Sequence, residues 1–505
     1  MIQKGFLGID AGTQGLSVIF TDESMKVVET GDGSYEMVAG LGEGCYEQNP
    51  GDWERAAGVA MEDLRRKLAK KGIEPNILAI GISGQMHGEV LADEQGVPTG
   101  PARLWCDSRN EAEGNELTEA FGTKMPKRIT AARWLWTTRN RSDWARRAKR
   151  MTTPGGWLAF RLTGQWNLGI GDAAGMFPID QTTMNFDERL LDKFNSICGT
   201  SVSSLKSLLP KVCKAGEDGG QLNEAGARLL GLPVGIPVAP AEGDQPAALA
   251  GSLIGSPGMV SMSFGTSVCA NSVGDRPFLG VSRSIDHFCA ADGRPINMVW
   301  LRNGTTFMNT VVEMFGEGSG GDRSSAFRRV MPQAVSAPAD CGGLLALPFM
   351  DDEPGLGIAR GGSAMLYGLS STNANAGNAA KAAILATMFN LRIGAEALDQ
   401  QNFPRTEIIL SGGLTKTPEL GQLLADVFNT PVKILDSAAE GSAWGASLLA
   451  KFRYLAINGT NDSWPNFLAA HNTGSATEFK PNGSAHALLA QSLIRYRKLL
   501  ANTIT

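Results

Sequence analysis

The sequence lacks the local signatures of several protein classes. Its seven cysteines are scattered, and no CxxC pair or Cys/His cluster occurs, so neither a disulfide framework nor a zinc site is predicted. No Gly-Lys dipeptide is present, which excludes a Walker A phosphate loop. Long runs of one charge sign are absent as well. The net charge of -5 is a weak argument against nucleic acid or an anionic membrane as the main partner.

The sequence also predicts no signal peptide and no membrane-spanning segment. The first residues, MIQKGFLGID, contain no apolar core of a signal peptide. The uncharged run 245–274 is long enough to suggest a membrane span, but glycines, a second proline and serines divide it into helix, turn and strand. No transmembrane segment is predicted. Because the scattered cysteines predict no disulfide framework, a reducing cytoplasm is the simplest setting for the protein.

The chain does have the length and composition of a large globular enzyme. Its 505 residues exceed what one core supports, so two domains are expected. Apolar residues make up 43% and charged residues 19%, which is ordinary for such a protein. The 62 glycines predict many tight turns or close backbone approaches to a ligand.

The order of predicted elements indicates a duplicated α/β architecture. Near the N-terminus an apolar strand enters a Gly-Thr turn and is followed by further strands and a helix. The predicted ranges there are strands at 5–12, 16–22 and 25–36, a helix at 49–72 and a strand at 77–83. The middle of the chain begins the same way, with predicted strand, turn and strand across 259–273, a helix at 378–400, strands at 407–413 and 432–435, and helices at 418–428 and 485–504. The Pro/Ala-rich segment GIPVAPAEG sets the expected boundary near residue 242, giving domains 1–242 and 243–505.

Two Gly-Thr turns are candidates for phosphate binding. In GIDAGTQG (8–15) a strand delivers Asp10 to its end, and Thr13 and Gln14 add polar groups to a turn whose amides could cradle phosphate. An Asp beside phosphate is reasonable if Mg²⁺ or its waters lie between them. SFGTS (263–267) repeats the pattern with Gly265, Thr266 and Ser267. Plain hairpin turns are the alternative for both.

Two further segments carry candidate site residues. In LSGG (410–413), Gly412 and Gly413 could present bare backbone to a flat group such as adenine, or form a βα turn without a ligand. In GISGQMHGEV (81–90), Met86 and His87 follow a buried strand between glycines. Here a binding role and a structural role are equally open.

Asp244 lies in VAPAEGDQPAALAG (238–251) and has two possible roles. With Gln245 and Pro246 after it, Asp244 fits a helix N-cap. It could instead be a general base. A carboxylate at a helix N-terminus is expected to keep a low pKa, and so to be a weak base. Phosphoryl transfer tolerates a weak base, because positioning and charge neutralisation matter more than strong deprotonation.

Taken together and in order, the motifs resemble those of the FGGY family of carbohydrate kinases. The resemblance runs from LGIDAGTQG to DSAAEGSAWGASLLA, nearly the whole chain. It is most similar to the xylulokinases within that family. The motifs that carry it are CYEQNPGDW, AIGISGQMHG, LWCDSR, RLTG, GDAAG, GDQPAALAG, SFGTS, YGLS and SGG…LLADVFNTPV.

The resemblance implies a fold and a set of roles. The fold is α/β, with two actin-like (ribonuclease H-like) domains of the actin/hexokinase/Hsp70 superfamily and a cleft between them. The sugar would bind mainly to the first domain and ATP mainly to the second, and the γ-phosphoryl group would pass to the 5-hydroxyl of D-xylulose with Mg²⁺. A homodimer is one assembly that the resemblance allows. The implied roles are base for Asp244, sugar binding for Met86 and His87, metal and first phosphate loop for Asp10 and Thr13, second phosphate loop for Gly265 and Thr266, and adenosine binding for Gly412 and Gly413.

One departure from the family pattern affects the expected substrate. The residue after the base is commonly Asn in xylulokinases and is Gln245 here, so another ketose or polyol such as ribulose, sedoheptulose or a tetrulose is the alternative acceptor. An actin-like nucleotide switch and a catalytically silent sugar sensor are further alternatives. His87 with Asp244 argues against the switch, and retention of Asp10 with Asp244 argues against the sensor.

Overall fold

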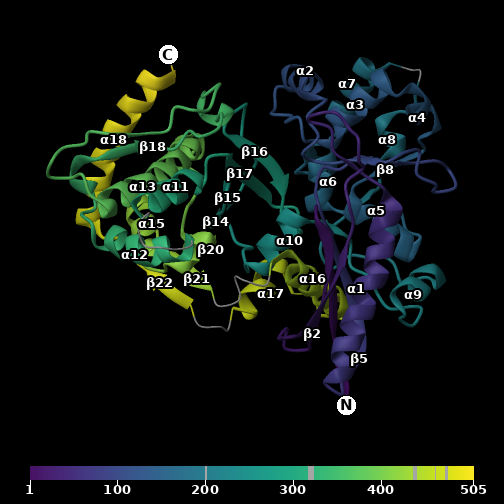
Figure 1. Ribbon diagram of the computed structural model, residues 1–505. Coiled ribbons are helices and arrows are strands. Elements are labelled where there is room, and N and C mark those ends of the chain that lie inside the picture. The colour runs from purple at the N-terminus through teal and green to yellow at the C-terminus, as the bar shows by residue number, and fades with distance from the viewer. Residues whose placement is uncertain (200–201, 317–322, 436–440, 461, 473–475, 505) are drawn as a thin grey trace. The chain divides into compact units, whose positions relative to one another are not determined.

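The computed structural model describes residues 1–199, 202–316, 323–435, 441–460, 462–472 and 476–504 (Figure 1). The chain forms two compact units that are interleaved in sequence. Unit 1 contains residues 1–255, 287–295 and 440–472, and unit 2 contains residues 256–286, 296–439 and 473–505. The predicted boundary at residue 242 concerns the family's two domains and stays a prediction.

Unit 1 is built on a five-stranded mixed sheet. Its spatial order is β13 (Glu242–Gly243), β5 (Glu74–Gly84), β1 (Ile2–Ala11), β2 (Gly15–Asp22) and β3 (Val27–Ser34). The strands β1, β2 and β3 are antiparallel neighbours, whereas β5 and β13 run parallel to β1. Strands β1, β2, β3 and β5 match their predicted segments, whereas the short strand β13 was not predicted.

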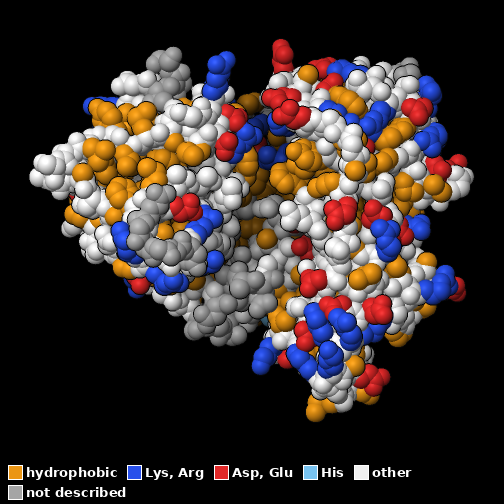
Figure 2. Space-filling model, in the orientation of Figure 1, with side chains coloured by type: hydrophobic (Ala, Val, Ile, Leu, Met, Phe, Trp, Pro, Cys, Tyr) orange, Lys and Arg blue, Asp and Glu red, His pale blue; other side chains and the backbone are white. Residues whose placement is uncertain are grey.

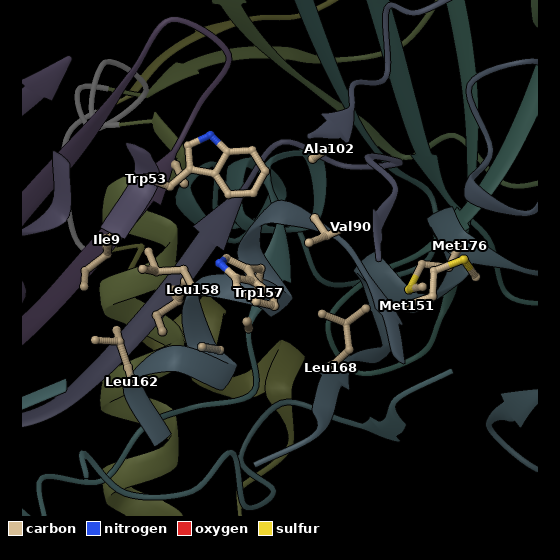
Figure 3. Close-up of a cluster of buried hydrophobic side chains, with 14 of the residues drawn as sticks. Ile9, Trp53, Val90, Ala102, Met151, Trp157, Leu158, Leu162, Leu168 and Met176 are labelled. Carbon is tan, nitrogen blue, oxygen red and sulfur yellow. The ribbon is translucent and has the colours of Figure 1, made fainter. Parts of the chain in front are cut away.

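Helices cover this sheet and close the core of unit 1. Helix α1 (Pro50–Lys70) buries Trp53, Leu64 and Leu68 on one face, as its spacing predicts. Figure 3 shows Ile9 of β1 and Trp53 of α1 together with buried side chains from later segments. Helix α16 (Gly441–Ile457) returns from late in the sequence and packs on β1 and β5 (Figure 1).

Unit 2 repeats the strand pattern of unit 1. Its seven-stranded sheet has the order β16 (Ile285–Cys289), β17 (Pro295–Leu301), β15 (Val268–Val273), β14 (Met259–Phe264), β20 (Glu407–Gly412), β21 (Val432–Leu435) and β22 (Ala476–Phe479). Strands β17, β15 and β14 are antiparallel neighbours, and β20 and β21 run parallel to β14. The same arrangement occurs in β3-β2-β1-β5-β13, so the predicted duplication is confirmed.

Two helices of unit 2, α11 (Thr306–Gly316) and α12 (Arg323–Ser336), were not predicted, and one predicted helix is divided. The continuous helix expected over 378–400 is two helices, α13 (Ala376–Gly394) and α14 (Glu396–Gln400), separated at Ala395. Helices α15 (Leu420–Phe428) and α18 (Gly483–Ile504) match their predicted segments.

The surface agrees with the mixed composition. Positive and negative side chains are interspersed on the face drawn in Figure 2. Within the described ranges, none of the helices has the length and apolar character needed to cross a membrane.

Candidate functional site

Three strand ends meet at one edge of the sheet in unit 1. Asp10 of β1 pairs in register with Ser83 of β5, and Ser83 pairs with Glu242 of β13. Because the three strands are parallel, the segments that follow them leave the sheet at the same edge. The structure therefore brings together three separately predicted segments, which contain Asp10, Met86 with His87, and Asp244.

Asp244 is the first residue of helix α10 (Asp244–Gly251) and is partly buried. Its N-cap is Gly243, so the predicted capping role of Asp244 is wrong. The predicted low pKa is wrong too. Burial and the nearby charge of Asp10 raise the pKa of Asp244 to about 7, against the opposing backbone hydrogen bonds from Gln245 and Met86. Gln245 is the second residue of α10 and is also partly buried.

Asp10 is held by hydroxyl groups from two other elements. Ser83 donates to Oδ1, and Ser442 of α16 donates to Oδ2 at 2.6 Å. Hydroxyl donors fix the carboxylate without cancelling its charge. Asp10 therefore presents oxygen ligands of the type that Mg²⁺ prefers. The described part of the chain contains no group of three or more His, Cys, Asp or Glu side chains placed to hold a metal.

Met86 and His87 follow β5 in a tight turn. Met86 is buried, and His87 has a left-handed backbone with φ of 65°. The Nδ1 atom of His87 donates to the carbonyl of Gly175 at 2.9 Å. Burial, aided by the charge of Arg128, lowers the pKa of His87 to about 3, so the ring is neutral. Its Nε2 atom is then a hydrogen-bond acceptor, suited to a substrate hydroxyl.

Two buried carboxyl groups beside Asp244 were not predicted as site residues. Glu242 accepts backbone hydrogen bonds from Gly171 (3.2 Å) and Asp172 (2.9 Å), and burial raises its pKa to about 8. Asp172 accepts from the hydroxyl of Thr153 at 2.5 Å, and burial raises its pKa well above the ordinary value. A Glu within the apolar run VAPAEG was the available signal for Glu242.

Helix α6 (Ile170–Met176) connects these groups to the histidine. Its first amides bind Glu242, and the carbonyl of Gly175 near its end binds His87. A Cβ at Gly175 would lie 3.0 Å from Nδ1 of His87, so the small residue permits this contact. The GDAAG motif (171–175) thus supports both the histidine and the strand that precedes Asp244.

The Gly-Thr turn between β1 and β2 is anchored by side chains of unit 1. Gln48 donates from Nε2 to the carbonyl of Thr13 at 2.8 Å, and Trp105 donates from Nε1 to its hydroxyl at 3.0 Å. Tyr35 donates to the backbone of the same turn. The hydroxyl of Thr13 keeps its own proton for another acceptor, and Gln14 is exposed. The turn therefore offers polar groups to a ligand in a fixed conformation.

In unit 2 the two other predicted ligand segments are direct neighbours. Phe264, the last residue of β14, pairs in parallel with Gly412 of β20. Gly412 has φ of 79°, and a Cβ there would lie 2.5 Å from the carbonyl oxygen of Phe264, so glycine is required. Gly265, Thr266, Gly412 and Gly413 are exposed, and Ser267 is partly buried. Two backbone-rich turns thus adjoin at the carboxyl ends of β14 and β20.

Comparison with protein families gives matches over most of the chain. Residues 6–251 match the model of the N-terminal domain of the FGGY family of carbohydrate kinases. Residues 260–454 match the model of the C-terminal domain of that family.

Similar proteins include xylulose kinases from two bacteria. The Haemophilus influenzae protein is 26% identical over 501 residues, covering 94% of this chain and 98% of that protein. The Streptomyces coelicolor protein is 28% identical over 461 residues, covering 88% and 87%.

Solved structures show the same fold. A xylulose kinase from Rhodospirillum rubrum gives a TM-score of 0.82 at 21% identity, covering 99% of this chain and 98% of that one. A gluconate kinase from Lactobacillus acidophilus gives 0.83 at 20% identity, covering 100% and 99%. The prediction of an α/β fold with two actin-like domains is confirmed.

Proposed function

The chain belongs to the FGGY family of carbohydrate kinases, and from this premise we propose that it transfers the γ-phosphoryl group of ATP to the 5-hydroxyl of D-xylulose. The products are D-xylulose 5-phosphate and ADP. Two matches support this substrate, because proteins similar over most of this chain are xylulose kinases. Location in the cytoplasm and assembly into a homodimer stay predictions from the sequence.

The observation that carries the proposal is the environment of Asp244. Its carboxylate lies at the edge where three parallel strands end, and its pKa is raised to about 7. A general base is most effective when its pKa is near the working pH. Asp244 takes the proton of the sugar hydroxyl as that oxygen bonds to the γ-phosphorus and the bond from phosphorus to ADP breaks.

Neighbouring residues orient the sugar in this proposal. The neutral ring of His87 accepts a hydrogen bond from a sugar hydroxyl through Nε2, because Nδ1 is committed to Gly175. The backbone amide of Met86 lies beside the Asp244 carboxylate and helps to fix it. Gln245 follows the base and provides an amide for a second hydroxyl.

ATP and Mg²⁺ are proposed to bind at the turns within 8–15, 263–267 and 410–413. Mg²⁺ neutralises phosphate charge when it is bound, and it commonly needs only one or two protein carboxylates. Asp10 is the ligand proposed here, fixed by two serine hydroxyls. The residues that bind the sugar are proposed to lie mainly in the 1–242 domain, and those that bind the nucleotide mainly in the 243–505 domain. The proposed nucleotide ligands are Thr13, Gln14, Gly265, Thr266, Ser267, Gly412 and Gly413.

The decisive experiment replaces the base. We expect Asp244→Asn to lower kcat by about 10²-fold or more, the usual range for a general base. Folding and ATP binding should persist, because the N-cap position belongs to Gly243 and no side-chain cap is lost. ADP release with D-xylulose measures the rate, and calorimetry measures ATP binding. Near-normal turnover in this variant would contradict the assignment.

A second candidate function is phosphorylation of another ketose or polyol. Gln245 supports this alternative substrate, because it follows the base and is longer than the asparagine that is common at this position in xylulokinases. A panel of ribulose, sedoheptulose, erythrulose and D-xylulose in the ADP-release assay separates the two. A rate with another sugar and none with D-xylulose would replace the specific substrate while leaving the kinase chemistry in place.

A further inference from the structure

The segment 303–305 fixes one side of the SFGTS turn of unit 2 through hydrogen bonds. The backbone N–H of Gly304 donates to the carbonyl of Thr266 at 2.9 Å. The backbone N–H and the hydroxyl of Thr305 both donate to the carbonyl of Gly265, each at 2.9 Å. A Cβ on Gly304 would lie 2.5 Å from the carbonyl oxygen of Gly265, so the contact requires glycine.

These bonds determine where the turn directs its amides. A trans peptide places its C=O and the N–H of the next residue on opposite sides. Because the carbonyls of Gly265 and Thr266 face the supporting segment, the amides of Thr266 and Ser267 face away from it. A turn fixed in this way offers two oriented N–H donors, the arrangement that binds phosphate oxygens.

The supporting segment is itself fixed by Asn303 and Glu353. The carboxylate of Glu353 accepts from the backbone N–H of Asn303 at 3.0 Å and from its Nδ2 atom at 3.1 Å. The Oδ1 atom of Asn303 accepts from the backbone of Asp351 at 2.9 Å. Asn303 and Glu353 are 3% and 1% exposed, so solvent cannot replace these bonds.

One more contact holds the same segment from helix α13. The hydroxyl of Thr387 donates to the carbonyl of Gly304 at 2.8 Å. The backbone of residues 303–305 is thus fixed from the 351–353 loop and from α13, and in turn fixes Gly265 and Thr266.

We infer that Asn303 and Glu353 are positioning residues for the phosphate-binding turn, acting through Gly304 and Thr305 without touching the nucleotide. This inference rests on the proposed function, in which Gly265, Thr266 and Ser267 bind the phosphates of ATP. Loss of either side chain releases the supporting segment, misaligns the two amides and weakens ATP binding.

The test compares Asn303→Ala and Glu353→Ala with a matched buried asparagine in the same unit. Asn373 is 4% exposed, donates from Nδ2 to Gly342 and Gly368, and accepts from the backbone of Ser370. Asn373→Ala therefore loses similar bonds away from the turn. We expect Asn303→Ala and Glu353→Ala to raise KM for ATP by about tenfold, which corresponds to about 1.4 kcal/mol of lost binding free energy. KM for the sugar should stay that of the wild type, and Asn373→Ala should lose thermal stability alone.

A conservative variant and a direct binding measurement complete the design. Glu353→Gln keeps an oxygen acceptor for the amide of Asn303, so its KM for ATP should lie close to that of the wild type. Equal KM values for ATP in Asn303→Ala, Asn373→Ala and the wild type would overturn the inference. The Kd for ATP without sugar is measured by calorimetry in every variant. If the wild type phosphorylates no sugar, the proposed function fails. Unchanged Kd values for ATP in Asn303→Ala and Glu353→Ala would overturn the positioning role whether or not a sugar is phosphorylated.

Discussion

At the scale of single residues, the pKa of Asp244 depends more on burial and the nearby charge of Asp10 than on its place at the start of a helix. The amides at the start of α10 stabilise the ionised carboxylate and lower its pKa. Removal from water and the charge of Asp10 act in the opposite direction, and together they outweigh the amides. The result is a base whose pKa is close to neutral pH, stronger than a helix N-terminus alone would provide.

This balance predicts the pH dependence of the reaction. Asp244 gains a proton as the pH falls through about 7, so kcat/KM for the sugar, which reports the groups of the ligand-free protein, should fall below that pH. His87 adds no step there, because its pKa of about 3 keeps it neutral. ADP-release rates at sugar concentrations below KM, from roughly pH 5.5 to 9, check this expectation. A fall only near the ordinary pKa of an aspartate would contradict the raised pKa.

The residues of the site differ in how far the sequence could identify them. Asp10 lies near the end of the apolar strand β1, and His87 comes shortly after the apolar strand β5, so local pattern was enough to place them at strand ends. Burial raises the pKa values of Asp172 and Glu242, and the backbone N–H of Asp172 binds the Glu242 carboxylate across 70 residues of sequence. The pKa of Asp244 likewise depends on Asp10, far away in the chain. Apart from the Glu in the apolar run VAPAEG, long-range burial of this kind leaves no local pattern.

At the scale of elements, glycines set how closely helix α16 approaches the sheet of unit 1. A Cβ at Gly81 of β5 would lie 1.8 Å from the carbonyl oxygen of Ala446, and one at Gly8 of β1 would lie 2.0 Å from that of Ala443. Both neighbours are backbone atoms, which cannot move aside as a flexible side chain can. The helix therefore rests directly on two strands that deliver site residues.

Gly81→Ala should consequently destabilise the protein. We expect a loss of about 1–3 kcal/mol or more, the usual cost of overpacking a core, seen as a lower urea midpoint. Gly51→Ala is the control, because a Cβ at Gly51 of α1 meets nothing within 4 Å. It should leave the midpoint unchanged or raise it slightly, since Ala restricts the unfolded chain. Equal midpoints for the two variants would contradict the close-packing argument.

At the scale of the whole molecule, the repeated strand pattern was predictable and the allocation of late segments was not. Each half opens with strand, Gly-Thr turn and strand, which the sequence displays directly. The periodicity of α16 marks a helix but carries no information on which sheet it covers. The structure assigns α16 to unit 1, where Ser442 binds Asp10 and Trp444 donates to the carbonyl of Met25.

Unit 1 should therefore require residues far beyond its first 255. A chain ended at residue 439 lacks α16, leaves the strands β1 and β5 uncovered on that face and removes a hydroxyl from Asp10. We expect it to lose cooperative unfolding of unit 1 and any thermal shift with D-xylulose. A chain lacking only residues 483–505 is the control, because α18 packs on α13, α15 and β18 (Leu345–Leu347) of unit 2. That control should keep the sugar-dependent shift, since every contact of α16 in unit 1 remains. A sugar-dependent shift of normal size in the 439-residue chain would show that unit 1 is complete without α16.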